Sequence, residues 1–209
     1  TELNPLMITY PGYIVGRSLR FRASASAYLS RTPSVASGYD KWTLSVWVKR
    51  CSVGSTQYII GGNTTSSGSR NELKVEISSD QLWVYAFNNG GGYYFQRTSS
   101  MVLRDPSAWY HLVVQFDPDN ATSANKIIAY INGVQVSWGV SSDSGVSGSI
   151  TSSAYRSINN TYRNDINAGY QTGGAPVYFT DNYLAEMNMI SGSIVSIGSF
   201  GKYAVSYTH

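Results

Sequence analysis

The 209-residue chain carries 15 Lys and Arg against 12 Asp and Glu, for a formal net charge of +3, and only 13% of its residues are charged. The basic residues are scattered, which argues against a nucleic-acid-binding surface. The apolar runs are too short to cross a membrane, the N-terminal residues lack the pattern of a secretion signal, and a single cysteine, Cys51, permits no internal disulfide.

The composition favours β-structure, since the chain has 17 Tyr, 20 Gly and no convincing helical period. Residues 1–17 form an N-terminal arm that we expect to pack against the domain itself or a neighbouring subunit. Strands are predicted over 18–22, 27–30, 42–49, 57–61, 72–78, 81–87, 93–98, 109–117, 126–132, 134–138, 149–157, 166–171, 176–180 and 183–190.

The stretch from Trp109 to Val136 is the strongest of these signals. Bulky apolar residues alternate from Tyr110 to Phe116, and neither face of this segment is charged, which predicts an interior strand. Asn132 and Gly133 supply the two positive φ angles of a type I′ turn, so the chain should fold back antiparallel after residue 131.

Short strands separated by Gly, Ser, Asn and Asp turns predict an all-β, two-sheet antiparallel jelly-roll sandwich. No Pro-rich, Gly/Ser-rich or charged linker divides the chain, so residues 18–209 are expected to form one domain.

Several motifs resemble the laminin G-like domains of the concanavalin A-like lectin/glucanase superfamily. They are SLRF (18–21), AYLSRTPS (27–34), WTLSVWVKR (42–50), DPSAWYHLVV (105–114) and YLAEMN (183–188), and the resemblance covers residues 18–201. The segments AYLSRTPS, DPSAWYHLVV and YLAEMN are similar in sequence to domains in structural proteins of tailed bacteriophages.

The resemblance implies a non-enzymatic structural protein of a phage virion, exposed on the particle surface. The expected role is a capsid decoration or cement subunit that contacts other virion proteins and forms homo-oligomers. The alternative is a tail or head fibre module that binds a host-surface glycan. The sequence shows no heptad stem or shaft repeat of the sort a fibre would need, which favours decoration.

An enzyme of the glucanase type is a weaker alternative. Glucanases of the superfamily carry closely spaced acidic residues on one strand, and the nearest match is Glu72-Leu73-Lys74-Val75-Glu76. Lys74 stands where the central Asp would be, and on a regular strand the two Glu lie about 13 Å apart unless a bulge shortens the distance. These residues are therefore interpreted as a solvated strand face, and His111 as a hydrogen-bonded sheet residue rather than a member of a catalytic triad.

Ligand binding is expected at aromatic side chains near strand ends and loop tips. Tyr93, Tyr94, Trp138 and Tyr155 are the candidates for contact with a glycan or a protein partner. Ca²⁺ is the commonest ligand in the resembled family, and Asp117, Asp119 and Asn120 form an oxygen-rich turn. The turn chemistry of Asp and Asn explains this segment more simply, so no metal ligands and no cofactor are predicted.

Overall fold

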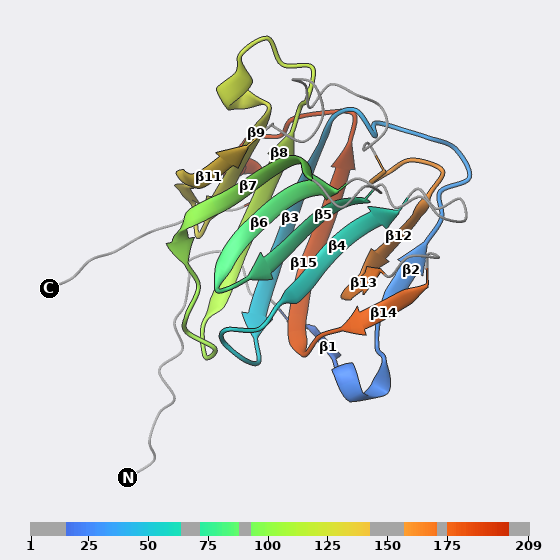
Figure 1. The fold of residues 1–209 in the computed structure, drawn as a ribbon, viewed down its shortest axis with the longest axis vertical. Coiled ribbons are helices and arrows are strands. Elements are labelled where there is room, and N and C mark those ends of the chain that lie inside the picture. Colours follow the sequence, from blue (N-terminus) through green and yellow to red (C-terminus); the bar gives the residue numbers. More distant parts are fainter. Residues whose placement is uncertain (1–15, 64–71, 88–92, 143–156, 171–174, 201–209) are drawn as a thin grey trace, which may run out of the picture.

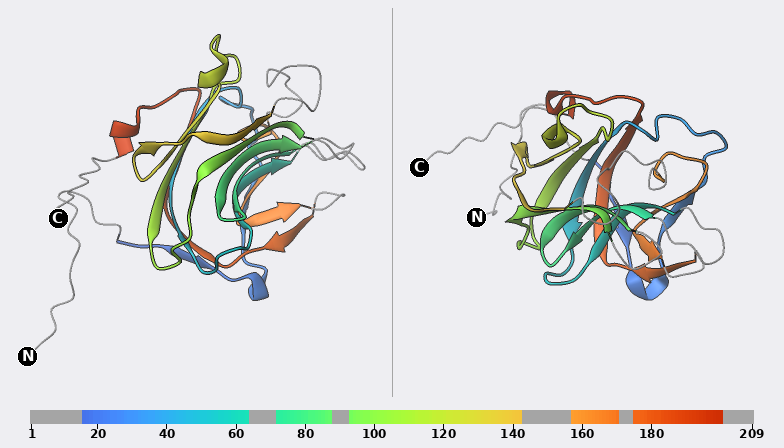
Figure 2. Two further views of the ribbon diagram at one scale, coloured as in Figure 1. Left: turned by 60° about the vertical axis from the view of Figure 1, so that its left-hand side comes forward. Right: turned by 45° about the horizontal axis from the view of Figure 1, so that its top comes forward.

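The computed structural model describes residues 16–63, 72–87, 93–142, 157–170 and 175–200. These residues form a sandwich of two antiparallel sheets, accompanied by a small two-stranded sheet (Figures 1 and 2). The helices in this part of the chain are single 3₁₀ turns, and none is long and apolar enough to cross a membrane.

In each sheet the strands lie side by side in the order given below, and each strand is hydrogen-bonded to the next. The six-stranded sheet contains β1 (Leu19–Phe21), β15 (Asn182–Ser191), β3 (Trp42–Arg50), β8 (Trp109–Phe116), β9 (Ile127–Ile131) and β10 (Val134–Gln135). The seven-stranded sheet contains β11 (Trp138–Ser142), β7 (Tyr93–Val102), β6 (Gln81–Phe87), β5 (Glu72–Ser78), β4 (Gln57–Asn63), β12 (Arg163–Ile166) and β2 (Leu29–Arg31). The small sheet contains β13 (Ala168–Tyr170) and β14 (Pro176–Phe179).

The predicted all-β jelly-roll sandwich is confirmed, and so are most of the predicted strands. The range 134–138 is wrong as one strand, because β10 pairs with β9 and β11 pairs with β7 in the other sheet. The range 166–171 is also divided, since Asn167 has a φ of +65° between β12 and β13. The predicted strand 149–157 lies almost entirely outside the described residues, and Ser157 itself is not in a strand.

Two tight turns set the register of neighbouring hairpins. Asn132 and Gly133 have φ angles of +50° and +82°, as the type I′ prediction requires, and Val134 pairs with Ile131. Ser79 and Asp80 have φ angles of +50° and +64° and connect β5 to β6. Each turn therefore determines which side chains of its strands face the core.

The core lies between the two large sheets. Its largest fully buried apolar side chains are Trp42, Leu44, Ile59, Leu73, Ile77, Leu82, Phe95, Leu103 and Phe116. The rings of Trp42 and Phe116 stack with centroids 5.0 Å apart and so join neighbouring strands of the six-stranded sheet within this core.

The outer face of the six-stranded sheet is covered as well. His111 lies on this face, almost fully buried, where its Nε2 is 2.8 Å from Ser45 Oγ and its ring stacks on Trp47 at 4.8 Å. Phe200 of the 3₁₀ turn Ile197–Phe200 lies 6.4 Å from the same ring. The interpretation of His111 as a hydrogen-bonded sheet histidine is confirmed, and burial lowers its pKa to about 4.

A buried arginine connects the two sheets. Arg50, at the end of β3, donates to Gln57 Oε1 (2.7 Å) and to the carbonyl of Leu103, and its guanidinium lies 2.8 Å from Asp80 Oδ1. Because Asp80 belongs to the turn between β5 and β6, this ion pair attaches the six-stranded sheet to the seven-stranded one. The backbone N–H of Gly54 and the Arg50 guanidinium together lower the pKa of Asp80.

Replacing Arg50 should therefore destabilise the fold strongly. Arg50→Met leaves buried acceptors without a donor, and we expect the free energy of unfolding to fall by about 3 kcal/mol, measured by urea denaturation. Arg104→Met is the matched control, because Arg104 also contacts Asp80 (3.5 Å) but is exposed, so its loss should cost less than about 1 kcal/mol. Equal losses in the two variants would contradict this account.

The neutral, buried state of His111 should make stability depend on pH. In the unfolded chain a histidine protonates near pH 6.5, whereas the folded value is about 4. The stability that this group contributes is therefore complete above pH 6.5 and is lost as the pH falls toward 4, at about 1.4 kcal/mol per unit. His111→Phe keeps a ring against Trp47 but does not titrate. Its free energy of unfolding relative to that of the wild type should therefore rise as the pH falls from 6.5 toward 4. A pH-independent difference between the two proteins in urea denaturation would refute the assignment.

Candidate functional site

The seven-stranded sheet is curved, and its concave face is turned away from the other large sheet (Figure 2). Strand β5 shows how the sequence builds it, because alternate side chains point to opposite faces. Leu73, Val75 and Ile77 face the core, so the residues that alternate with them, Glu72, Lys74 and Glu76, lie on the concave face.

These charged residues are buried rather than solvated. Glu72, Lys74 and Glu76 are 0%, 2% and 6% exposed, so the interpretation of this segment as a solvated strand face is wrong. The physical reason is that aromatic side chains cover it. Lys74 Nζ lies 5.4 Å from the ring centroid of Tyr58 and 5.6 Å from that of Tyr170, and β13 carries Tyr170 over β4.

Each charge has a defined partner. Lys74 Nζ forms an ion pair with Glu72 Oε2 at 2.5 Å, and the hydroxyl of Tyr85 donates to Glu76 Oε2 at 3.0 Å. Burial raises the pKa of Glu76, while the Lys74 charge and the Tyr85 hydrogen bond oppose that rise. Burial, followed by the Glu76 carboxylate, raises the pKa of Tyr85 well above its usual value, so the phenol remains a hydrogen-bond donor.

A row of aromatic rings continues the concave face along β6 and β7. Tyr85 packs edge-to-face with Trp83 (6.2 Å between centroids) and with Tyr93 (5.4 Å), and Tyr93 packs in the same way on Phe87 (5.4 Å). Trp83 and Phe87 are half-buried, and Tyr93 is 37% exposed. The indole N–H of Trp83 is enclosed and has no hydrogen-bond partner in the described part of the chain.

The structure separates the four predicted aromatic residues. Tyr93 lies in the concave row, whereas Tyr94 and Trp138 are half-buried against the core, and the indole of Trp138 donates to the carbonyl of Ile127 at 3.3 Å. Tyr155 lies outside the described residues. Sequence reasoning did not select Trp83, because β6 is apolar on both faces and offers no alternation to mark the functional side.

The acidic residues of β5 lie on a strand that has no bulge. Strand β5 pairs with β6 in unbroken register from Glu72 to Ser78, and the irregularity against β4 lies between Tyr58 and Ile60 of the partner strand. The bulge that could bring Glu72 and Glu76 together is therefore absent from β5. Four positions of regular strand place the two Cα atoms about 13 Å apart. Lys74 lies between the two glutamates in the sequence and on the same face, and it is paired with Glu72.

The oxygen-rich segment from Asp117 to Asn120 forms a turn that reverses the direction of the chain. The backbone N–H of Asn120 donates to the Asp117 carbonyl at 3.0 Å, and the Asp117 carboxylate is engaged by Lys41 Nζ at 3.1 Å. Within the described ranges, no group of three or more His, Cys, Asp or Glu is placed to hold a metal ion.

Comparison with solved structures finds similar folds at low sequence identity. The mouse laminin α1 chain, domains LG4-5, aligns with a TM-score of 0.53 and 12% identity over 87% of this chain and 43% of that one. The CBM40 of the Ruminococcus gnavus IT-sialidase aligns with a TM-score of 0.51 and 12% identity over 78% and 81%. The same module bound to α2,3-sialyllactose gives 0.50 and 12% over 77% and 80%.

No curated protein matches the sequence. A laminin G-type family model, described as the concanavalin A-like lectin/glucanases superfamily, matches residues 23–183. That match covers most of the chain, and it includes the strands that build the concave face. The chain therefore belongs to the concanavalin A-like lectin/glucanases superfamily, as a laminin G-type domain.

Proposed function

We propose that this domain is a non-enzymatic binding module that holds a glycan on the concave face of its seven-stranded sheet. The observation that carries the proposal is the aromatic row of that face, where Tyr93 is 37% exposed and Trp83 is half-buried in the same row. Aromatic rings beside hydrogen-bonding groups suit a sugar, which has both apolar C–H faces and hydroxyls.

The fold supports this choice of ligand class. The CBM40 relative is a module bound to sialyllactose, although at 12% identity the likeness extends to the fold alone. The concave face here adds a polar group from this chain, because Tyr85, within the aromatic row, carries a hydroxyl that donates to Glu76. A glycan seated on Tyr93 would lie close to Tyr85, whose ring is 5.4 Å from that of Tyr93.

We propose a structural role for the acidic residues of β5 and not a catalytic one. Hydrolysis of a glycoside needs one carboxyl group as acid and a second as nucleophile or base at close spacing. Glu72 is paired with Lys74, and Glu76 lies four positions away on a regular strand. The two carboxylates therefore serve the packing of the concave face.

The setting that we propose is the surface of a bacteriophage particle, where the domain acts as a tail or head fibre module that recognises a host-surface glycan. The motifs AYLSRTPS, DPSAWYHLVV and YLAEMN support that setting through their similarity to phage structural proteins. The partners would be other virion proteins and further copies of this chain.

The glycan proposal is tested on an array that includes α2,3- and α2,6-sialyllactose and bacterial surface polysaccharides. Tyr93→Ala and Trp83→Ala should each weaken binding of the best glycan by about fivefold, since each removes a ring contact worth about 1 kcal/mol. Tyr183→Ala is the matched control, because Tyr183 contacts Arg20 (5.5 Å) on the other sheet.

Two outcomes would refute the proposal. One is the absence of any bound glycan on the array. The other is turnover of a polysaccharide that disappears in Glu72→Gln or Glu76→Gln, which would make the domain a hydrolase.

A second candidate function is a capsid decoration or cement subunit, and an apolar groove favours it. The groove, of about 390 Å³, opens between the edge strands β1 and β2 and is lined mainly by Leu19, Phe21, Leu29, Ile166, Leu184 and Met187. Leu19 and Leu29 are 55% and 47% exposed, which is typical of a surface that another subunit covers.

Particle incorporation distinguishes the two roles. If the groove anchors the subunit to a shell, Leu29→Glu should reduce incorporation by about tenfold. Val53→Glu is the control, because Val53 is 48% exposed but lies outside the groove, and it should leave incorporation unchanged.

Density for the protein over the whole icosahedral shell would favour decoration, and density confined to the tail would exclude it. Unchanged incorporation after deletion of residues 1–16 would show that the N-terminal arm is not the anchor.

A further inference from the structure

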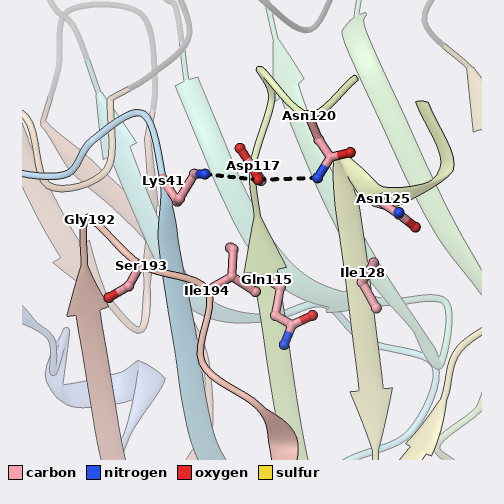
Figure 3. Close-up of a pocket in the computed structure, with 9 residues that line it drawn as sticks. All are labelled: Lys41, Gln115, Asp117, Asn120, Asn125, Ile128, Gly192, Ser193 and Ile194. Atoms are coloured by element: carbon pink, nitrogen blue, oxygen red, sulfur yellow. Dashed lines mark hydrogen bonds and ion pairs between the residues drawn. The ribbon is translucent and has the colours of Figure 1, made fainter. Parts of the chain in front are cut away.

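A second, polar pocket lies at one end of the six-stranded sheet (Figure 3). Its volume is about 500 Å³, within the range of small-molecule sites. Its walls come from the loop before β3, the end of β8, the β8–β9 loop, β9 and the segment after β15. The pocket is therefore separate from the concave face, which belongs to the other sheet.

One wall of the pocket is held in place by hydrogen bonds to the sheet. The N–H of Gly192 donates to the carbonyl of Lys41 at 2.7 Å, and the N–H of Val195 donates to Thr43 Oγ1 at 3.0 Å. The Gln115 amide donates to the carbonyl of Val195 at 2.8 Å. Thr43 and Gln115 are buried, so the segment after β15 is fastened to the sheet.

The charges at the pocket cancel each other. Lys41 Nζ lies 3.1 Å from Asp117 Oδ2, and the Asn120 amide donates to the same oxygen at 3.3 Å (Figure 3). A metal cation would have to displace the lysine, and an anion would meet the carboxylate. The pocket thus favours a ligand without net charge.

Hydrogen-bonding capacity remains around this ion pair. Both contacts to the carboxylate reach Oδ2, which leaves Oδ1 of Asp117 as an acceptor, and the Lys41 ammonium keeps two of its three protons for a ligand. Asn125 is exposed and its amide makes no hydrogen bond within the described residues. Ile128 and Ile194 add an aliphatic surface.

We propose that this pocket binds a neutral polyhydroxylated ligand, a single sugar unit or a similar polyol. Sugar hydroxyls both donate and accept, and a pyranose ring also carries C–H groups, so such a ligand matches the mixture of ammonium, carboxylate, amide and aliphatic groups around the pocket. The site does not depend on glycan binding by the concave face.

The test is a titration of the ¹⁵N-labelled chain with methyl α-glucoside, methyl β-galactoside and N-acetylglucosamine, each up to about 10 mM. At least one of them should shift the side-chain amide signals of Gln115, Asn120 and Asn125 in a saturable manner. Asn125→Ala, which removes an exposed amide, should weaken that binding by about tenfold, and Lys41→Gln should weaken it similarly.

Tyr93→Ala is the control, because it should leave this titration unchanged even if it abolishes binding at the concave face. Calcium chloride and sodium sulfate should not produce the saturable shifts. The proposal is wrong if none of the three sugars shifts these signals, if Ca²⁺ or sulfate shifts them instead, or if Asn125→Ala binds as tightly as the wild type.

Discussion

The burial of both faces of the seven-stranded sheet is the constraint on which the rest of the structure depends. Strand β5 has a dry core on one side, formed by residues such as Val75, and a second enclosed layer on the other, where Glu72 and Lys74 are almost completely buried. Charges taken out of water destabilise a fold unless they are paired and hydrogen-bonded. The concave face is consequently a network in which each group limits where its neighbours can lie.

That network gives the acidic residues of β5 a structural role. Lys74 neutralises Glu72 and lies beneath the rings of Tyr58 and Tyr170, so removing the lysine would leave a buried carboxylate without its counter-charge. Glu76 accepts from Tyr85, which in turn supports Tyr93 at the accessible end of the aromatic row. The buried charges thus hold the aromatic surface rigid, and a rigid surface loses less entropy when it binds a ligand.

The sequence predicted the fold better than the site, for a physical reason. Alternation and turn chemistry are local, so they located β5 and β6 and the turn at Asn132. They could not reveal that the segment after Gln135 changes sheets, since β10 and β11 differ in partner rather than in residue pattern. Nor could they show that Lys74 is enclosed, because its cover comes from Tyr170, almost a hundred positions away along the chain.

The concave face and the polar pocket lie on different sheets, and the core between them is close-packed. The two sites share no lining residue, so occupation of one should have little direct effect on the affinity of the other. Two independent weak sites on one module can still act together when they meet the same polysaccharide, because the second contact then forms at a high effective concentration. In the phage setting that we propose, many copies on one particle would make affinity for a host surface depend on the number of contacts, and each single site could remain weak.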